Sequence, residues 1–242
     1  MWEITIKCQT RHKDMAFYIK DKLLSHFNNN VVVGQYISGK CCLSIGVNDK
    51  HKIKVWDYIK HLLCDIFCVQ FKNEFLKNNI TFITPQNQYF NAFIKVYTYF
   101  DLELEQSICY RLIDYASTIV LESYFAFKLN ALKQKWKDLC AITNNNSTAF
   151  LSSETFLSLL KFLIDNLNYK TDSVIVSVDD SCLTYLDKSN NQVLVGLEKD
   201  DIKVICTLIE LSPKQILLHD KSYSSLKRLI LQLFDGRVKN YT

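Results

Sequence analysis

The sequence predicts an α+β fold with an N-terminal β-α-β-β-α unit, a central helical bundle and a C-terminal mixed α/β segment containing a β-hairpin. Three observations lead to this prediction. Apolar and polar residues alternate over short runs at both ends of the chain, whereas apolar residues recur every three or four positions in the middle. These are the periods of half-buried strands and of amphipathic helices. With 242 residues, 48% of them hydrophobic, the chain can bury a substantial core without disulfides.

The first 80 residues justify the N-terminal unit. Trp2, Ile4, Ile6 and Cys8 alternate with polar residues, and the pattern then changes to helical spacing. The expected elements, in order, are a strand over 2–8, a helix over 13–27, strands over 31–35 and 41–47 joined by a turn at 37–40, and a helix from near Asp49 to Leu76.

The remaining sequence supplies the helical middle and the mixed C-terminal segment. Asp200 or Asp201 is expected to cap a helix that ends near Leu211, because the Ser212-Pro213 pair that follows breaks a helix. The expected elements are helices over 89–100, 104–139 (interrupted or not) and 154–167, strands over 174–178, 182–186 and 193–195, a helix over 200–211, a strand over 216–219 and a helix over 222–234. The last two strands before residue 200 form the predicted hairpin.

Two domain divisions fit this pattern. Residues 1–85 form one small α+β unit and residues 86–242 form a helical and mixed α+β region, or the two run together as one continuous domain.

Composition and the distribution of charge argue against a secreted or membrane-spanning protein and leave a polyanionic partner open. The net charge of +4 is modest and its lysines are interleaved with acidic residues, so a polyanionic partner is neither required nor excluded. Charged residues interrupt the N-terminus and every apolar run, so we expect no secretory signal and no membrane span. Nine cysteines in such a chain are expected to be reduced and buried, and the expected compartment is the cytoplasm.

A segment from Gly34 to Lys40 has the G-x-x-x-x-G-K spacing of a phosphate-binding loop, and Asp179-Asp180 follows an apolar run in the manner of a magnesium-binding strand. Cys41 stands where the motif needs a hydroxyl, and a thiol is a poor magnesium ligand. The next residues alternate as a strand rather than opening a helix. Nucleotide binding is therefore not expected.

A second candidate is a stripe of potential metal ligands on the long helix, Asp57, His61, Cys64 and Cys68. With a rise of about 1.5 Å per residue, the four side chains are spread over roughly 16 Å and cannot all reach one ion. Because no second ligand pair is present, core cysteines beside an interfacial histidine are the favoured interpretation. We therefore predict no metal and no cofactor.

Two smaller groups of reactive side chains are also interpreted as structural. Cys41 and Cys42 should fall on opposite faces of a strand, without a neighbour that would lower a thiol pKa. His219-Asp220 ends a strand, but no nucleophile motif accompanies it. The sequence thus displays no catalytic centre, and we predict that the protein is not an enzyme.

Four lysines surround Trp136 on the central helix: Lys128, Lys133, Lys135 and Lys137. A basic amphipathic stretch of this kind can meet RNA, DNA or an anionic surface. A solvated helical face with one aromatic side chain turned inward is the simpler interpretation. Nucleic-acid binding by the segment Lys128–Lys137 is therefore the alternative hypothesis for the function of the protein.

Four segments then resemble a known family. They are Y-R-L-I-D-Y (110–115), F-L-S-L-L-K-F-L-I-D (156–165), D-I-K-V-I-C-T-L-I-E-L-S-P-K-Q-I-L-L-H (201–219) and L-F-D-G-R-V (233–238). Their succession resembles the YtxC-like family of endospore-forming Firmicutes over residues 106–238. The chain departs from that family at Ser212, where alanine is expected, and at 239–242, which lacks the family's cysteines.

The resemblance implies a sporulation-associated protein, and it supplies no catalytic residues because the family has no assigned activity. We therefore expect a cytoplasmic, non-catalytic factor that binds another protein, of unknown identity, through its helical middle. Binding of nucleic acid is the alternative hypothesis. A nucleotide- or metal-dependent enzyme, tested by substitution of Lys40, is the third hypothesis.

Overall fold

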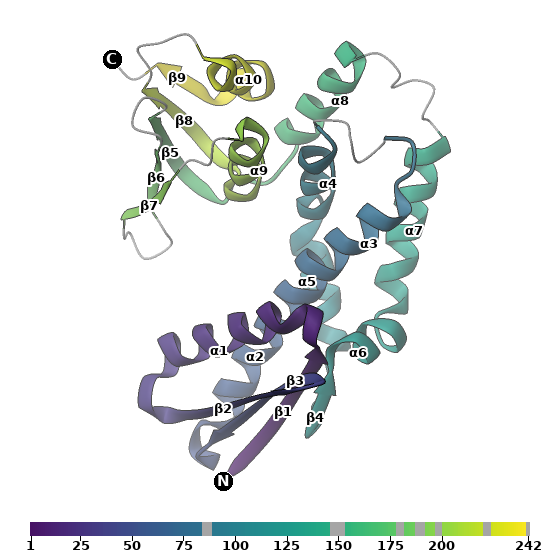
Figure 1. Cartoon of the computed structure of the whole chain (residues 1–242), viewed down its shortest axis with the longest axis vertical. Helices are drawn as coiled ribbons and strands as arrows, with labels where there is room; N and C mark the ends of the chain where they lie inside the picture. Colours follow the sequence, from purple (N-terminus) through teal and green to yellow (C-terminus); the bar gives the residue numbers. More distant parts are fainter. Residues whose placement is uncertain are drawn as a thin grey trace. The chain divides into compact units, whose positions relative to one another are not determined.

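The computed structural model describes residues 1–83, 89–145, 153–177, 182–186, 192–196, 200–219 and 224–240, and it confirms the α+β class (Figure 1). Two compact units are present. The first comprises Met1–Phe75 and Asp101–Leu139, and the second comprises Leu76–Phe100 and Cys140–Thr242. The sequence left open two units, residues 1–85 and 86–242, or one continuous domain. Each compact unit of the structure is assembled from two separate stretches of chain.

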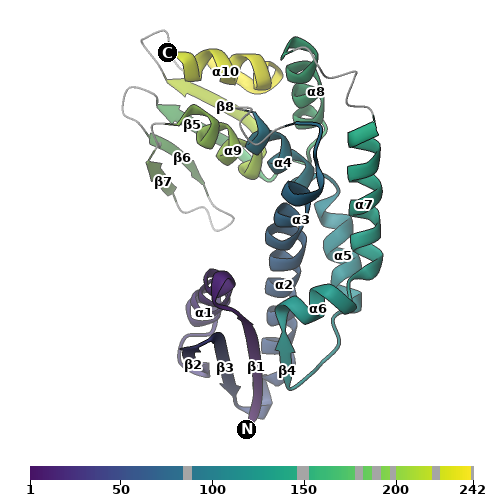
Figure 2. The same ribbon diagram turned by 45° about the vertical axis from the view of Figure 1, so that its right-hand side comes forward.

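The first unit contains one mixed sheet. Its strands are β1 (Trp2–Gln9), β2 (Val31–Ser38), β3 (Lys40–Val47) and β4 (Thr118–Val120). Within the described residues they form a four-stranded sheet in the order β2-β3-β1-β4. β3 is antiparallel to both of its neighbours, and β4 runs parallel to β1. Figure 2 shows β2 at the outer edge of this sheet.

The hairpin between β2 and β3 turns at a single glycine. Ser38 and Lys40 are cross-strand partners, and Gly39 between them has φ of 64°. A residue with a Cβ rarely adopts this left-handed conformation, so the position favours glycine. The two predicted strands are confirmed, but they extend into the predicted turn at 37–40, so that only Gly39 lies between them.

Helices cover one face of the first sheet. The first of these helices is α1 (Lys13–Phe27), and a short 3-10 turn, η1 (Thr10–His12), directly precedes it. The long predicted helix is present as α2 (Lys52–Asp65), the π-helical segment η4 (Ile66–Phe71) and α3 (Lys72–Asn79). Alternate residues of the sheet are buried on the helix side: Trp2, Ile4, Ile6, Cys8, Cys41, Leu43, Ile45 and Val47.

The predicted helix over 104–139 is interrupted. It is replaced by α5 (Leu102–Leu112), β4, α6 (Leu121–Phe127) and α7 (Asn130–Asn145). Ile119 of β4 is paired with Ile6 of β1 and is buried. Pairing with a distant strand therefore determines the conformation of this short apolar segment.

The second unit contains the other sheet. Its elements are α4 (Phe90–Tyr99), α8 (Ser153–Asp165), β5 (Thr171–Ser177), β6 (Cys182–Leu186), β7 (Gln192–Gly196), α9 (Asp201–Leu211), β8 (Pro213–His219), α10 (Ser225–Phe234), η6 (Asp235–Arg237) and β9 (Val238–Asn240). In the described part of this unit the strand order is β7-β6-β5-β8-β9. The predicted hairpin is confirmed as β6 and β7, which pair antiparallel; β9 was not predicted.

Local chemistry explains how the second unit alternates helix and strand. The carboxylate of Asp200 accepts a hydrogen bond from the backbone N–H of Ile202 at 3.0 Å, and this caps α9. Ser212 ends α9 in a left-handed conformation with φ of 35°. Pro213 then begins β8, where a helix cannot continue because proline lacks an N–H. Figure 1 shows α9 and α10 on one face of this sheet.

Arg237 joins three segments of the second unit. It is buried, and its guanidinium donates hydrogen bonds to Ser212 Oγ at 3.3 Å and to the carbonyl of Pro213 at 3.2 Å. It also donates to the carbonyl of Ile164 at the end of α8. A planar guanidinium suits this role because it offers five donors in a fixed arrangement.

Candidate functional site

The structure excludes a phosphate-binding loop at Gly34–Lys40. Gly34 lies within β2, Gly39 forms the hairpin turn, and β3 follows in place of a helix. The thiol side chain of Cys41 is buried on the helix-covered face of the sheet. The segment therefore presents no row of backbone N–H groups at a helix N-terminus. Asp179 and Asp180 lie outside the described residues.

The potential ligands on the long helix separate into an exposed pair and a buried group. His61 Nε2 lies 3.9 Å from Asp57 Oδ2 at the surface. Cys64 and Cys68 are buried beside Cys109 of α5. Hydrogen bonding with the Cys64 and Cys68 thiols, together with burial, raises the pKa of Cys109 far above its ordinary value. Among the described residues no group of three side chains could hold a metal ion.

The vicinal cysteines lie in β3, and His219 lies at the end of β8. Cys41 is paired across the sheet with Cys8, and Cys42 on the opposite face is half-buried. Burial, followed by the effect of the Cys41 thiol, raises the pKa of Cys8 to about 12, so Cys8 is a thiol and a poor nucleophile at neutral pH. His219 is half-buried at the end of β8, and Asp220 lies outside the described residues.

The lysine-rich helix has its aromatic side chain turned inward, as the simpler interpretation predicts. Trp136 is buried and donates a hydrogen bond to Glu105 Oε1 at 2.9 Å. The Lys133 ammonium donates to the carbonyl of Ala126, and burial and Lys137 lower its pKa. Lys128, Lys135 and Lys137 are exposed, and Phe127, the residue before Lys128, is 77% exposed.

Sequence reasoning missed a buried ion pair in the first unit. Lys72 Nζ lies 2.8 Å from Glu105 Oε2, and both side chains are almost fully buried. Burial lowers the pKa of Lys72 and raises that of Glu105, while the mutual attraction opposes both shifts. Because Trp136 donates to the other carboxylate oxygen, the cluster connects α3, α5 and α7. Lys72 and Trp136 lie 33 and 31 positions from Glu105 along the chain, so no local sequence pattern predicts these contacts.

A second polar cluster surrounds His12 in the same unit. The buried imidazole contacts Glu122 through Nδ1 at 2.7 Å and Glu74 through Nε2 at 3.3 Å. Glu122 also accepts the backbone N–H of Gln9 at 2.8 Å. Burial alone would raise the pKa of Glu122, but the hydrogen bonds from Gln9 and His12 outweigh it and lower that pKa. Through its contacts with Gln9 and His12, Glu122 holds α6 against the end of β1.

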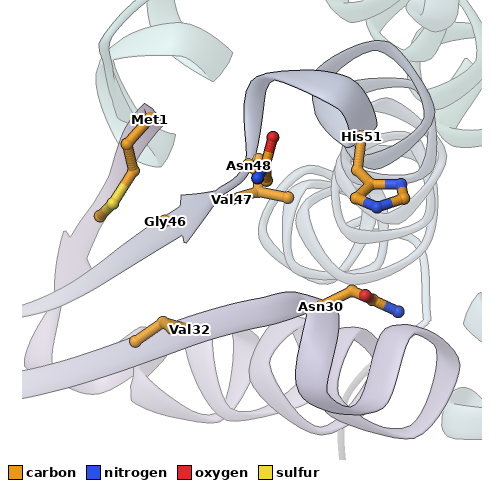
Figure 3. Close-up of a pocket in the computed structure, with 7 residues that line it drawn as sticks. All are labelled: Met1, Asn30, Val32, Gly46, Val47, Asn48 and His51. Atoms are coloured by element: carbon orange, nitrogen blue, oxygen red, sulfur yellow. The ribbon is translucent and has the colours of Figure 1, made fainter.

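A pocket opens at one end of the first sheet. It has a volume of about 330 Å³ and is lined by Met1, Asn30, Val32, Gly46, Val47, Asn48 and His51. Figure 3 shows Met1 and Val32 on one side, with Asn48 and His51 on the other. The Asn48 side chain accepts the backbone N–H of Lys50 at 3.1 Å, so it is engaged in a turn. The lining contains no nucleophile paired with a base.

This pocket borders the uncovered face of the sheet and its edge strand. Val32 and Tyr36 point away from the helices and are 71% and 68% exposed. Their cross-strand neighbours are Gly46 and Cys42. Between the two side chains lies a row of small residues, Gly34, Ser44 and Thr5. β2 and this face form the candidate binding surface of the first unit.

No protein-family model, curated protein or solved structure matches the chain. The resemblance of residues 106–238 to the YtxC-like family therefore stays a prediction. Along the described residues, no helix is both long and apolar enough to cross a membrane.

The buried ion pair generates a test of its structural role. Glu105→Leu removes the carboxylate that pairs with the buried Lys72 ammonium and should lower the free energy of unfolding by about 3–5 kcal/mol, as is typical of broken buried pairs. Lys72→Met combined with Glu105→Leu removes both charges and should cost less than Glu105→Leu alone. Urea denaturation measures each value. Lys161→Met, which breaks the exposed pair with Asp235, is the control and should cost less than about 1 kcal/mol. A double variant that loses as much stability as Glu105→Leu alone, or more, would contradict this role.

The lowered pKa of Glu122 predicts a pH-dependent contribution to stability. The folded pKa lies below the ordinary value of 4.5, so the ionised carboxylate stabilises the fold above that value and this contribution is lost as pH falls through the folded pKa. The stability difference between the wild type and Glu122→Gln should therefore shrink between neutral pH and strongly acidic pH. Chemical denaturation over this range measures it, with exposed Glu154→Gln as the control. A difference that is constant with pH would refute the prediction.

Proposed function

We propose that this protein is a sporulation-associated factor that acts without catalysis and binds a partner protein. The observation that carries the proposal is the uncharged, exposed strand β2. Its eight residues, V-V-V-G-Q-Y-I-S, include Val32, Tyr36 and Ile37, which are 71%, 68% and 47% exposed. Exposed apolar groups of this kind commonly mark interaction surfaces.

The chemistry of the described side chains supports a binding role. The buried thiols of Cys8 and Cys109 have raised pKa values, the buried Lys72 ammonium is paired with the Glu105 carboxylate, and the buried His12 imidazole contacts the Glu122 carboxylate. Such groups stabilise a fold and do not suit nucleophilic or general-base chemistry. Because the exposed apolar side chains of β2 adjoin the pocket and the uncovered face, they favour β2 over the helical middle as the partner surface.

The sporulation association rests on the resemblance to the YtxC-like family. Arg237 supports it in structural terms, because its hydrogen bonds connect three of the resembling segments: 156–165, 201–219 and 233–238. If these segments form a structural unit shared with the family, they are expected to contact one another, as they do at Arg237.

Nucleic-acid binding at Lys128–Lys137 is the second candidate. The exposed Phe127 beside Lys128 favours it, because single-stranded nucleic acids stack on aromatic side chains next to cations. The inward orientation of Trp136 and the hydrogen bond from Lys133 to Ala126 leave a smaller basic surface than the sequence suggested.

The proposal is tested by quantitative affinity capture from a lysate of sporulating cells. Tyr36→Lys introduces a charge on the uncovered face and should reduce the captured partner roughly tenfold or more, since a buried unpaired charge at an interface is costly. Ile53→Lys, at an apolar position of α2 that is 83% exposed, is the matched control and should retain the partner.

Equal capture by the wild type and by both variants would contradict the proposal. A partner that is lost on nuclease treatment would favour the nucleic-acid alternative. Thermal unfolding of each variant shows whether its fold is intact.

A further inference from the structure

The edge of β2 lacks the features by which proteins protect exposed edge strands. Edge strands usually carry charged residues, prolines or bulges, because their free N–H and C=O groups can pair with another strand. β2 has eight residues without a charge or a proline, and it is paired with β3 at every position from Val31 to Ser38. Alternate N–H and C=O groups of such a strand point away from its neighbour. Figure 2 shows β2 as the outermost strand of this sheet.

The sequence of β2 is complementary to itself. In an antiparallel pair centred on Gly34, the Gly34 residues of two copies would face each other. Val32 would then lie opposite Tyr36 of the second copy, and Val31 opposite Ile37. An aromatic residue opposite a β-branched residue is a favourable cross-strand pair. No position in this register brings two like charges together, because β2 carries none.

The helix layer carries a further exposed apolar side chain, on the opposite side of the sheet from Val32 and Tyr36. Tyr18 and His26 of α1 face α2, since Tyr18 donates to Asp65 at 3.2 Å and His26 stacks on Tyr58. At about 100° per residue, Leu24 lies on the other side of α1. Lys20, one turn before it, reaches Gln35 of β2 at 3.5 Å. Leu24 is 38% exposed, so the helix side of this edge presents one apolar side chain, Leu24, and one charged side chain, Lys20.

We propose that β2 pairs with β2 of a second copy of this chain, so that two first-unit sheets form one continuous antiparallel sheet across a two-fold axis. A two-fold axis requires the same surface on both copies, and β2 meets this requirement through its neutral, self-complementary sequence. The inference rests on the proposed function in one respect, namely that β2 is a binding surface. It identifies the occupant of the edge as another copy, while the uncovered face of the joined sheet remains available to a different partner.

Gly34 offers a precise test, because a Cβ built at this position meets nothing within 4 Å. Gly34→Lys and Gly34→Glu therefore fit the folded monomer, yet each places two like charges opposite each other at the proposed axis. Sedimentation equilibrium should show a dimer for the wild type. Each charged variant should raise the dimer dissociation constant roughly tenfold or more. An equimolar mixture of Gly34→Lys and Gly34→Glu should recover dimers that contain one copy of each.

Gly34→Thr is the uncharged control and should remain dimeric, because threonine suits a strand. A monomeric wild type at high micromolar concentration would overturn the inference, and so would dimers that are unaffected by both charged variants. Neither result concerns the capture of a different partner by the uncovered face. Conversely, a Gly34-dependent dimer together with equal capture by the wild type and Tyr36→Lys would sustain self-pairing and contradict the proposed function.

Discussion

Burial of one face of the first sheet beneath α1 and α2 is the constraint that decides which surfaces of this unit remain for binding. Side chains alternate between the two faces of a strand, so packing Ile4, Leu43 and Ile45 inward fixes an outward set on the same strands. That outward set is small or polar in the centre and apolar at the edge, where Val32 and Tyr36 are exposed. A shift of one residue in any strand would reverse this arrangement.

The buried polar groups hold together chain segments that are distant in sequence. Glu122 receives hydrogen bonds from residues more than one hundred positions earlier in the chain, Gln9 and His12. Glu105 is bonded to both Lys72 and Trp136. Each carboxylate is therefore satisfied by fixed donors, which is what a buried anion requires. These clusters organise the first unit around its sheet.

Periodic segments could be predicted from the sequence, and short segments that depend on distant pairing could not. The alternation over residues 2–8 and the helical spacing over 13–27 led to β1 and α1, and Asp200 marked the start of α9. β4 has three residues, Thr118–Val120, and its strand conformation depends on β1. The same reasoning explains why His12 and Lys72 were missed, because their partners are apparent only after the chain has folded. The charge-free composition of β2 was visible in the sequence, but its position at the edge of the sheet was not.

Pairing of the β2 edge with a second copy should depend on protein concentration. Hydrogen–deuterium exchange of the wild type at low and at high protein concentration tests it most directly, because pairing would protect the outward amides of this strand. Slower exchange at high concentration is expected for peptides that cover residues 31–38, with exchange in β3 and β1 unchanged. Identical exchange at both concentrations, or protection confined to other elements, would contradict it.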